Sequence, residues 1–232
     1  MKESNKIKNI AILTSRSGRN ANDIINAIEK GLINANIACI IGNRSHCEFI
    51  EKIKKTNYDS YFLDHEDYSN RDHFDAKLME ILKSYSIDIV VSCSFSRLLS
   101  HNFIDHYPST INSHPSLLPA FPGRTSCGLK PVDAAFEYGV KFIGATVHFV
   151  DRHVDNGPII IQAVTPVMNS YREKDFLKKI LEMESRIKIQ ALYWLINDRL
   201  IINGRNISVK NEETKTIYND SYLIYPTLDD GF

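Results

Sequence analysis

The sequence predicts an α/β protein with an open, mostly parallel, twisted sheet and helices on both faces. Along the first half of the chain, short apolar runs typical of strands alternate with segments whose apolar residues recur at helical spacing. The apolar runs are nearly continuous, as in parallel strands that helices cover on both faces. Strand–helix units that follow one another in this way form an open sheet through right-handed crossovers.

The first half contains predicted strands at residues 9–14, 37–41, 60–63 and 87–92, and predicted helices at residues 20–30, 47–55 and 71–85. The strand at 87–92 reads IDIVVS and is mostly apolar, as expected for a buried strand. The helix at 71–85 repeats apolar residues every four positions, at Phe74, Leu78 and Leu82. That spacing places them on one face, which predicts a helix packed against the sheet.

The second half contains predicted strands at residues 109–113, 144–150 and 158–164, and predicted helices at residues 133–138 and 173–197. Residues 115–123 hold three prolines and one glycine, which predicts a loop. The long helix carries a stripe of apolar residues that includes Phe176, Ile180 and Met183. After residue 200 we expect a short hairpin and then a loosely held terminus.

The composition is that of an ordinary globular protein, with 43% hydrophobic and 24% charged residues among 232. These values exclude a disordered chain, a collagen and a coiled coil. The 28 basic residues are balanced by 28 acidic ones, which argues against a nucleic-acid partner. We expect a single domain over residues 1–232, with halves at 8–105 and 106–200 and a C-terminal hairpin and tail at 201–232.

Two features favour a cytoplasmic protein. The N-terminus lacks the apolar segment of a secretory signal, and no apolar run is long enough to span a bilayer, so we expect no membrane partner. The cysteines are Cys39, Cys47, Cys93 and Cys127, which lie far apart and form no CxxC pair. We interpret them as reduced thiols rather than as a disulfide framework or a metal site.

A candidate anion site lies where the first strand meets the first helix, in the segment SRSGRN at residues 15–20. A turn around Gly18 at a helix N-terminus offers backbone N–H groups and the positive end of the helix dipole to a phosphate. Arg16 and Arg19 add charge, and arginine can bind phosphate through two parallel hydrogen bonds. The alternative interpretation is a polar turn in which Asn20 caps the helix.

Asn112 and His114 are two residues apart at the end of a predicted strand, so their side chains share a face. Ligands of open α/β folds bind at such strand ends. An amide donor and an imidazole could together stabilise an oxyanion and move a proton, although a merely polar strand end is the simpler alternative. Asp155 lies in the segment VDNGP and is most simply a turn former. Beside His114 it would instead orient the imidazole and favour its charged form.

Four segments together resemble the folate-dependent formyltransferases: NSHPSLLP at 112–119, FPG at 121–123, GATVHFV at 144–150 and DNGPIIIQ at 155–162. The resemblance extends over residues 10–200. It implies a Rossmann-like formyltransferase fold and the transfer of a formyl group to a primary amine. It also implies two small-molecule substrates, a phosphorylated amine and the reduced folate 10-formyltetrahydrofolate, with no metal. On this resemblance we expect a monomer or a homodimer.

The resemblance also assigns roles to residues. Asn112 and His114 would stabilise the oxyanion, and Asp155 would keep His114 charged and help to move the proton. The phosphorylated substrate would be bound by Arg16, Gly18, Arg19, Asn20, Pro115 and Glu184. The reduced folate would be bound by Arg71, Phe95, Arg97, Leu98, Leu99, Val150, Asp151 and Val154.

Departures from the family pattern concern the amine substrate. Arg16 and Arg19 stand where the family usually has a glycine and a small hydroxyl residue, and Ser96 stands where the purine type tends to carry methionine. Three alternatives stay open: formylation of a nucleotide-linked amino sugar, hydrolysis of formyltetrahydrofolate, and folate binding without catalysis. His148 lies in the strand at 144–150, and we favour a structural role for it over a catalytic one.

Overall fold

The computed structural model describes residues 6–15, 18–44, 47–123, 130–168, 173–210, 218–219, 222–226, 228–229 and 231. The chain divides into two compact units, residues 1–110 and 111–232. Within the described ranges, no helix has both the length and the apolar composition needed to cross a membrane.

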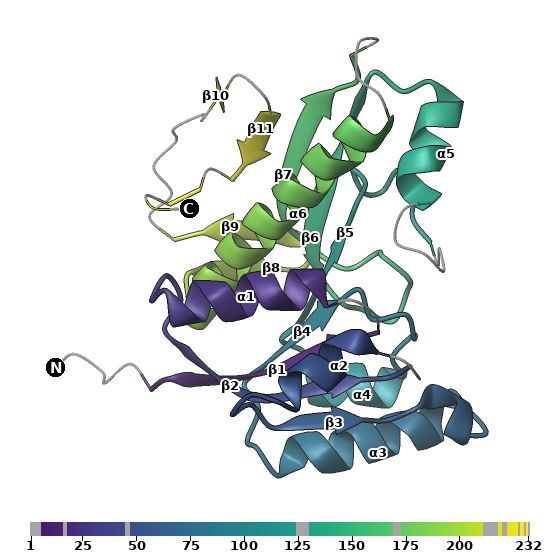
Figure 1. Cartoon of the computed structure of the whole chain (residues 1–232). Coiled ribbons are helices and arrows are strands. Elements are labelled where there is room, and N and C mark those ends of the chain that lie inside the picture. Colours follow the sequence, from purple (N-terminus) through teal and green to yellow (C-terminus); the bar gives the residue numbers. More distant parts are fainter. Residues whose placement is uncertain are drawn as a thin grey trace, which may run out of the picture. The chain divides into compact units, whose positions relative to one another are not determined.

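The first unit is built on parallel strands in the order β4-β1-β2-β3 (Figure 1). The strands are β1 (Lys8–Thr14), β2 (Ala35–Gly42), β3 (Ser60–Phe62) and β4 (Ile89–Cys93). Every residue of β4 is buried, and so are the last five residues of β1. Burial on both faces explains why their apolar runs are continuous rather than alternating.

Helices of the first unit follow these strands along the chain. They are α1 (Arg19–Glu29), α2 (Glu48–Ile53), the 3-10 helix η1 (His65–Asp67), α3 (Arg71–Lys83) and α4 (His101–His106). β2 and β3 are added on one side of β1, whereas the connection from β3 returns across the sheet to β4 on the other side of β1. Because such crossovers are right-handed, α1 and α2 lie on one face of the sheet and α3 lies on the other.

The sequence analysis did not predict α4. The Oγ of Ser100 accepts a hydrogen bond from the Phe103 N–H (3.2 Å), and the Ser100 N–H donates to the buried carboxylate of Asp75 on α3. Burial raises the pKa of Asp75 above its ordinary value. Six residues are too few to show a helical period, so this helix depends on its cap and its packing rather than on its pattern.

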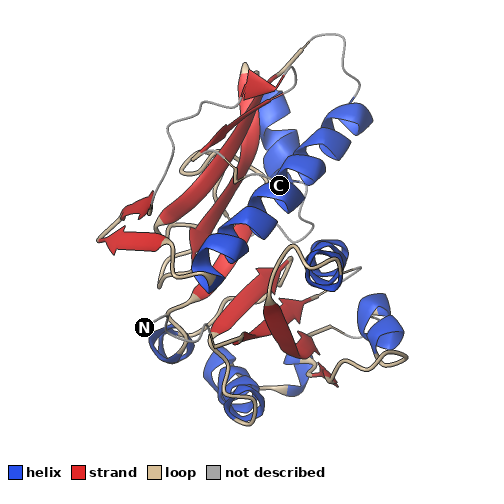
Figure 2. Ribbon diagram, turned by 90° about the vertical axis from the view of Figure 1, so that its left-hand side faces the viewer, coloured by secondary structure: helices blue, strands red, loops and turns tan. Residues whose placement is uncertain are grey.

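The second unit is built on antiparallel strands in the order β10-β11-β7-β6-β5. The strands are β5 (Thr110–His114), β6 (Phe142–Phe149), β7 (Ile159–Pro166), β10 (Tyr218–Asn219) and β11 (Tyr222–Tyr225). The helix α5 (Lys130–Tyr138) precedes β6, and the long helix α6 (Glu173–Ile196) packs along β6 and β7 (Figure 2). A separate hairpin joins β8 (Leu200–Asn203) to β9 (Asn206–Val209).

The predicted α/β class, with helices on both faces, is confirmed. The parallel strands belong to the first unit, where strand and helix alternate, and most predicted elements end within a few residues of the observed ones. The strands of the second unit are antiparallel, which the sequence analysis did not specify.

The expectation of a loosely held C-terminus is wrong for β11 and for Asp229. β11 pairs antiparallel with β7. The Asp229 carboxylate accepts a hydrogen bond from the Trp194 Nε1–H (3.0 Å) and forms an ion pair with Arg199. β11 and Asp229 are therefore held by residues far away in the sequence, which no local pattern records.

Cys39, Cys47 and Cys93 are buried in the first unit and form no disulfide with one another. Cys127 lies outside the described residues. Burial raises the pKa of Cys39 to about 12, so this thiol stays protonated and unreactive at neutral pH.

Candidate active site

Four polar side chains gather where β5 pairs with β6 in the second unit. In the antiparallel register Asn112 lies opposite His148, and His114 lies opposite Thr146. Residues that are directly opposite share a face of the sheet, and so do residues two apart on one strand. The side chain of Ser113 therefore projects to the other face.

His114 and Asp155 are in direct contact. The Nδ1 of His114 lies 3.3 Å from the Oδ2 of Asp155, and the two side chains are 7% and 12% exposed. The Nε2 of His114 lies 2.9 Å from the backbone carbonyl oxygen of Phe121. Because a carbonyl oxygen only accepts, Nε2 carries a hydrogen. The ring is thus held at both nitrogens, and Nδ1 is the one that faces the carboxylate.

The turn that carries Asp155 joins β6 to β7. Asp155 has a left-handed backbone (φ 47°), a conformation that aspartate tolerates better than most residues. At the start of the turn, Asp151 accepts hydrogen bonds from the His153 N–H (2.8 Å) and from the Asn156 side-chain amide (3.3 Å). The Oδ2 of Asp155 also accepts a hydrogen bond from the Gly123 N–H (3.2 Å). These bonds fix the direction of the carboxylate.

Two further features fix this turn: the close approach of Gly157 to β6 and a hydrogen bond from the β8–β9 hairpin. A Cβ atom on Gly157 would lie 1.8 Å from the carbonyl oxygen of Phe149, so only glycine lets the turn close against β6. From the β8–β9 hairpin, Arg205 donates a hydrogen bond to the carbonyl oxygen of Asn156 (2.6 Å). The position of Asp155 is therefore set by the whole turn rather than by its own side-chain contacts.

His148 also faces Asp155, through the other carboxylate oxygen. Its Nε2 lies 3.7 Å from the Oδ1 of Asp155, and its Nδ1–H donates to the carbonyl oxygen of Phe149 (2.7 Å). Burial lowers the pKa of His148, although the nearby Asp155 carboxylate opposes this shift. The sequence analysis favoured a structural role for His148, and the structure places it beside the candidate catalytic carboxylate.

The proline-containing loop after His114 is held by residues that the sequence analysis missed. The Oγ1 of Thr146 donates to the carbonyl oxygen of Ser116 (2.7 Å) and accepts from the Leu118 N–H (3.1 Å). On β7, the side-chain amide of Gln162 donates to the carbonyl oxygen of Leu118 (3.0 Å). The polar residues within the apolar strands β6 and β7 were the signal that could have identified both.

Other candidate residues of the second unit lie around the same strands. Glu184 of α6 is buried and accepts a hydrogen bond from the Ser113 Oγ. Pro115 follows β5 directly and is buried, whereas Val150 and Asp151 are half-buried and Val154 is exposed.

The candidate phosphate turn lies in the first unit. Gly18 is the N-cap of α1, with φ 63° and no side-chain hydrogen bond at the cap. The alternative in which Asn20 caps the helix is therefore wrong. A Cβ atom on Gly18 would lie 2.0 Å from the Cγ of Phe49, which leaves room only for glycine. Arg19 is exposed, and Asn20 is buried. Arg16 lies outside the described residues.

The candidate folate turn follows β4 in the first unit. It contains Phe95, Arg97, Leu98 and Leu99, whereas Arg71 is the first residue of α3. The guanidinium of Arg97 lies 4.8 Å from the centre of the Phe74 ring. Within the turn, the Ser96 N–H donates to the Ser15 Oγ (2.7 Å), and the Arg44 Nε–H donates to the Ser96 Oγ (2.9 Å). The turn is thus bound to the ends of β1 and β2.

The structure brings Asn112, His114 and Asp155 together in the second unit. The candidate phosphate and folate turns lie in the first unit, at the ends of β1 and β4 where parallel strands of such folds bind ligands. Among the described residues, no group of three or more His, Cys, Asp or Glu side chains could hold a metal ion.

Comparison with known proteins identifies the family. A family model described as formyl transferase matches residues 8–192. A formyltetrahydrofolate deformylase of Haemophilus influenzae is 33% identical over 196 residues, which are 84% of this chain and 68% of that protein. A phosphoribosylglycinamide formyltransferase of Escherichia coli K12 is 31% identical over 193 residues, 83% of this chain and 89% of that protein.

Solved structures give the same result. The crystal structure of glycinamide ribonucleotide transformylase 1 from Symbiobacterium toebii matches with a TM-score of 0.82 and 35% identity. The match covers 90% of this chain and 96% of the other. With the family model covering most of the sequence, this chain belongs to the formyl transferase family of folate-dependent enzymes.

Proposed function

We propose that this chain transfers the formyl group of 10-formyltetrahydrofolate to the amine of glycinamide ribonucleotide, a step of purine biosynthesis. The observation that carries the proposal is the contact of His114 with Asp155 (3.3 Å). His114 lies on β5, the strand that also carries Asn112. Similarity to the Symbiobacterium toebii transformylase over most of both chains supports this choice of amine.

In the proposed reaction, the amine nitrogen attacks the formyl carbon and a tetrahedral oxyanion forms. The Asn112 amide donates a hydrogen bond to that oxyanion, and the His114 ring stabilises it electrostatically; a positioned donor such as Asn112 typically lowers a barrier by about 3 to 4 kcal/mol. The bond between the formyl carbon and the leaving nitrogen of the folate then breaks. The proton lost by the attacking amine passes to that nitrogen with the help of Asp155.

Binding of the two substrates is divided between the halves of the chain in this proposal. Within residues 8–105, Gly18, Arg19 and Asn20, together with Arg16, bind the ribotide phosphate at the N-terminus of α1. Residues 106–200 carry the reacting groups, with Pro115 and Glu184 beside the ribotide. The folate is bound by main-chain groups of the turn that contains Arg97 and by the turn that precedes Asp155.

A second candidate is hydrolysis of formyltetrahydrofolate, in which water takes the place of the amine. The observation in its favour is the identity of 33% with the Haemophilus influenzae deformylase, close to the value for the transformylase from Symbiobacterium toebii. The same oxyanion forms in both reactions, so Asn112, His114 and Asp155 would act alike. The two functions differ in whether an amine is needed.

The test is consumption of 10-formyltetrahydrofolate at neutral pH with and without glycinamide ribonucleotide. The transferase reading predicts consumption that depends on the ribotide. Equal consumption without it, with release of formate, would establish the hydrolase instead. If neither condition consumes the folate although it binds, nucleotide-linked amino sugars become the next substrates to examine.

A further inference from the structure

A buried lysine on α6 has no place in the chemistry described so far. Lys188 is 1% exposed, and its Nζ has no hydrogen-bond partner among the described residues. The Oε1 of Glu184, one helical turn earlier, lies 3.9 Å from that Nζ. Taking an ammonium out of water is unfavourable unless an opposite charge compensates it. The carboxylate of Glu184 is in position to do so.

The same carboxylate oxygen connects Lys188 to β5. The Oε1 of Glu184 accepts a hydrogen bond from the Oγ of Ser113. Ser113 lies between Asn112 and His114, and its side chain points to the opposite face of the strand. A line of contacts therefore runs from the ammonium of Lys188 through a carboxylate to the strand residue that separates the catalytic pair.

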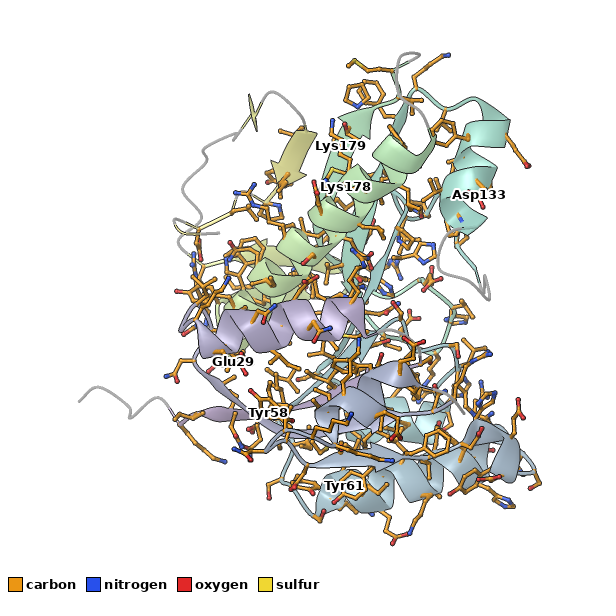
Figure 3. The ribbon with its side chains drawn as sticks, viewed as in Figure 1. Glu29, Tyr58, Tyr61, Asp133, Lys178 and Lys179 are labelled. Carbon is orange, nitrogen blue, oxygen red and sulfur yellow. The ribbon has the colours of Figure 1, made fainter. Side chains whose placement is uncertain are left out.

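A second lysine–glutamate pair on α6 is exposed and serves as a comparison for the buried pair of Lys188 and Glu184. Lys178 (Figure 3) and Glu182 have the same spacing of four residues, with Nζ and Oε1 3.8 Å apart. Their side chains, however, are 79% and 63% exposed. Water and salt screen an exposed pair, which therefore contributes little. The pair of Lys188 and Glu184 has side chains only 1% and 6% exposed and is screened far less.

We propose that Lys188 is a positioning residue for the catalytic pair. Its ammonium fixes the carboxylate of Glu184, which holds the hydroxyl of Ser113 and so the backbone of β5 between Asn112 and His114. Lys188 itself touches no reacting atom. The proposal rests on the proposed function only for the roles of Asn112 and His114, because the contacts themselves do not depend on the reaction.

The consequence is kinetic. Donors aimed at a developing oxyanion must lie close to its position in the transition state, and a small displacement weakens them there more than it weakens substrate binding. Loosening β5 should therefore lower kcat, while the KM for the folate, whose binding turns lie elsewhere in the chain, stays nearly unchanged.

The test compares Lys188→Met, which removes the charge and nearly keeps the volume, with the matched control Lys178→Met. We expect kcat for formyl transfer to fall about 10-fold to 100-fold in Lys188→Met, with the KM for the folate within about twofold of its original value. Lys178→Met should keep the original kcat. Unchanged kcat in Lys188→Met would overturn the proposal.

A second variant covers the case in which Lys188→Met fails to fold. Ser113→Ala removes one oxygen atom and should lower kcat in the same way. If Lys188 acts through Ser113, kcat in the double variant, which combines Lys188→Met and Ser113→Ala, should fall no further than in the more impaired single variant. Losses that multiply would show two independent structural effects and would contradict the proposal.

Amide hydrogen exchange separates failure of this proposal from failure of the proposed function. If the unaltered chain forms no formylated ribotide, the choice of amine is wrong, yet the positioning contact can still be measured. Lys188→Met or Ser113→Ala should then speed exchange in a peptide that covers β5 and leave β2 unchanged. Equal protection of β5 in all variants would overturn the proposal whatever the substrate.

Discussion

At the scale of single residues, the site depends on a carboxylate that lies between two histidines. The Oδ2 of Asp155 faces the Nδ1 of His114 at 3.3 Å, and its Oδ1 faces the Nε2 of His148 at 3.7 Å. Both rings are otherwise bonded to backbone carbonyl oxygens. The Asp155 carboxylate is therefore held against both rings, and in the proposed reaction it is the group that helps to move the proton.

Asp155→Asn tests this role because it keeps the shape of the side chain and removes its charge. We expect kcat to fall by about 10² to 10⁴, the usual contribution of a positioned acid or base, while folate binding stays close to the original. Steady-state kinetics and equilibrium binding of the folate measure the two effects. The control Asp133→Asn, at an exposed residue of α5 (Figure 3), should leave both unchanged. Turnover close to the original in Asp155→Asn would remove the assignment.

His148 gives a pH dependence of stability. Burial lowers its folded-state pKa, so below its ordinary value of 6.5 the unfolded chain binds a proton that the folded chain does not. Stability should therefore fall as the pH drops below 6.5, by up to about 1.4 kcal/mol per pH unit for this one proton. Urea unfolding of His148→Gln at pH 7.5 and 5.5 should show a smaller loss than the original chain.

The exposed His73 supplies the control for that comparison. His73→Gln should keep the pH dependence of the original chain, because it leaves His148 and its surroundings unchanged. If His148→Gln and the original chain lost the same free energy of unfolding between the two pH values, burial of His148 would not be the cause.

At the scale of elements, the turn between β6 and β7 sets the position of Asp155. In Gly157→Ala the new Cβ would meet the Phe149 carbonyl oxygen at 1.8 Å, so the turn must shift. We expect a loss of about 1 to 3 kcal/mol in unfolding free energy, as for other overpacked sites, together with a fall in kcat. Thermal or urea unfolding and steady-state kinetics measure the two.

Gly31 provides a matched comparison for this turn. It has φ 74° and nothing within 4 Å of an added Cβ, so Gly31→Ala meets backbone strain but no clash. That substitution should cost about 1 kcal/mol and leave kcat unchanged. Equal kcat in both variants would show that the closure of the β6–β7 turn does not set the geometry of Asp155.

The C-terminal segment is a second element whose attachment can be tested. Asp229 bonds to the single tryptophan of the chain, Trp194, and pairs with Arg199. In Asp229→Ala we expect a loss of about 2 kcal/mol in unfolding free energy, since charged hydrogen bonds are removed. Acrylamide quenching of Trp194 fluorescence should increase. The exposed Glu137→Ala should change neither, and unchanged quenching in Asp229→Ala would contradict the attachment.

The elements that the sequence predicted are those with a strong period or a long apolar run. The helix α3 repeats apolar residues every four positions, and β4 is mostly apolar, so both were located within a few residues. The short helix α4 and the strand β11 were missed because a cap on Ser100 and pairing with β7 define them, and both involve distant residues.

At the scale of the whole molecule, the sequence analysis located the candidate catalytic residues better than the residues that hold them in position. Asn112, His114 and Asp155 follow from the strand end and from the family resemblance, and the structure brings them together in one unit. Thr146 was missed as a support of the site: a polar residue in an apolar strand was the only signal, because hydrogen bonds to backbone groups of the 115–123 loop leave no periodic trace.

The central claim of this account is that the formyl group moves from the folate to the amine of a ribotide, with Asn112, His114 and Asp155 acting on the oxyanion. The most direct test follows the formyl carbon itself, with 10-formyltetrahydrofolate labelled with ¹³C in the formyl group and excess glycinamide ribonucleotide. The account predicts that the label appears as an amide on the ribotide amine, at a rate that falls sharply in Asp155→Asn. Label that appears only as free formate, at a rate independent of the ribotide, would contradict it.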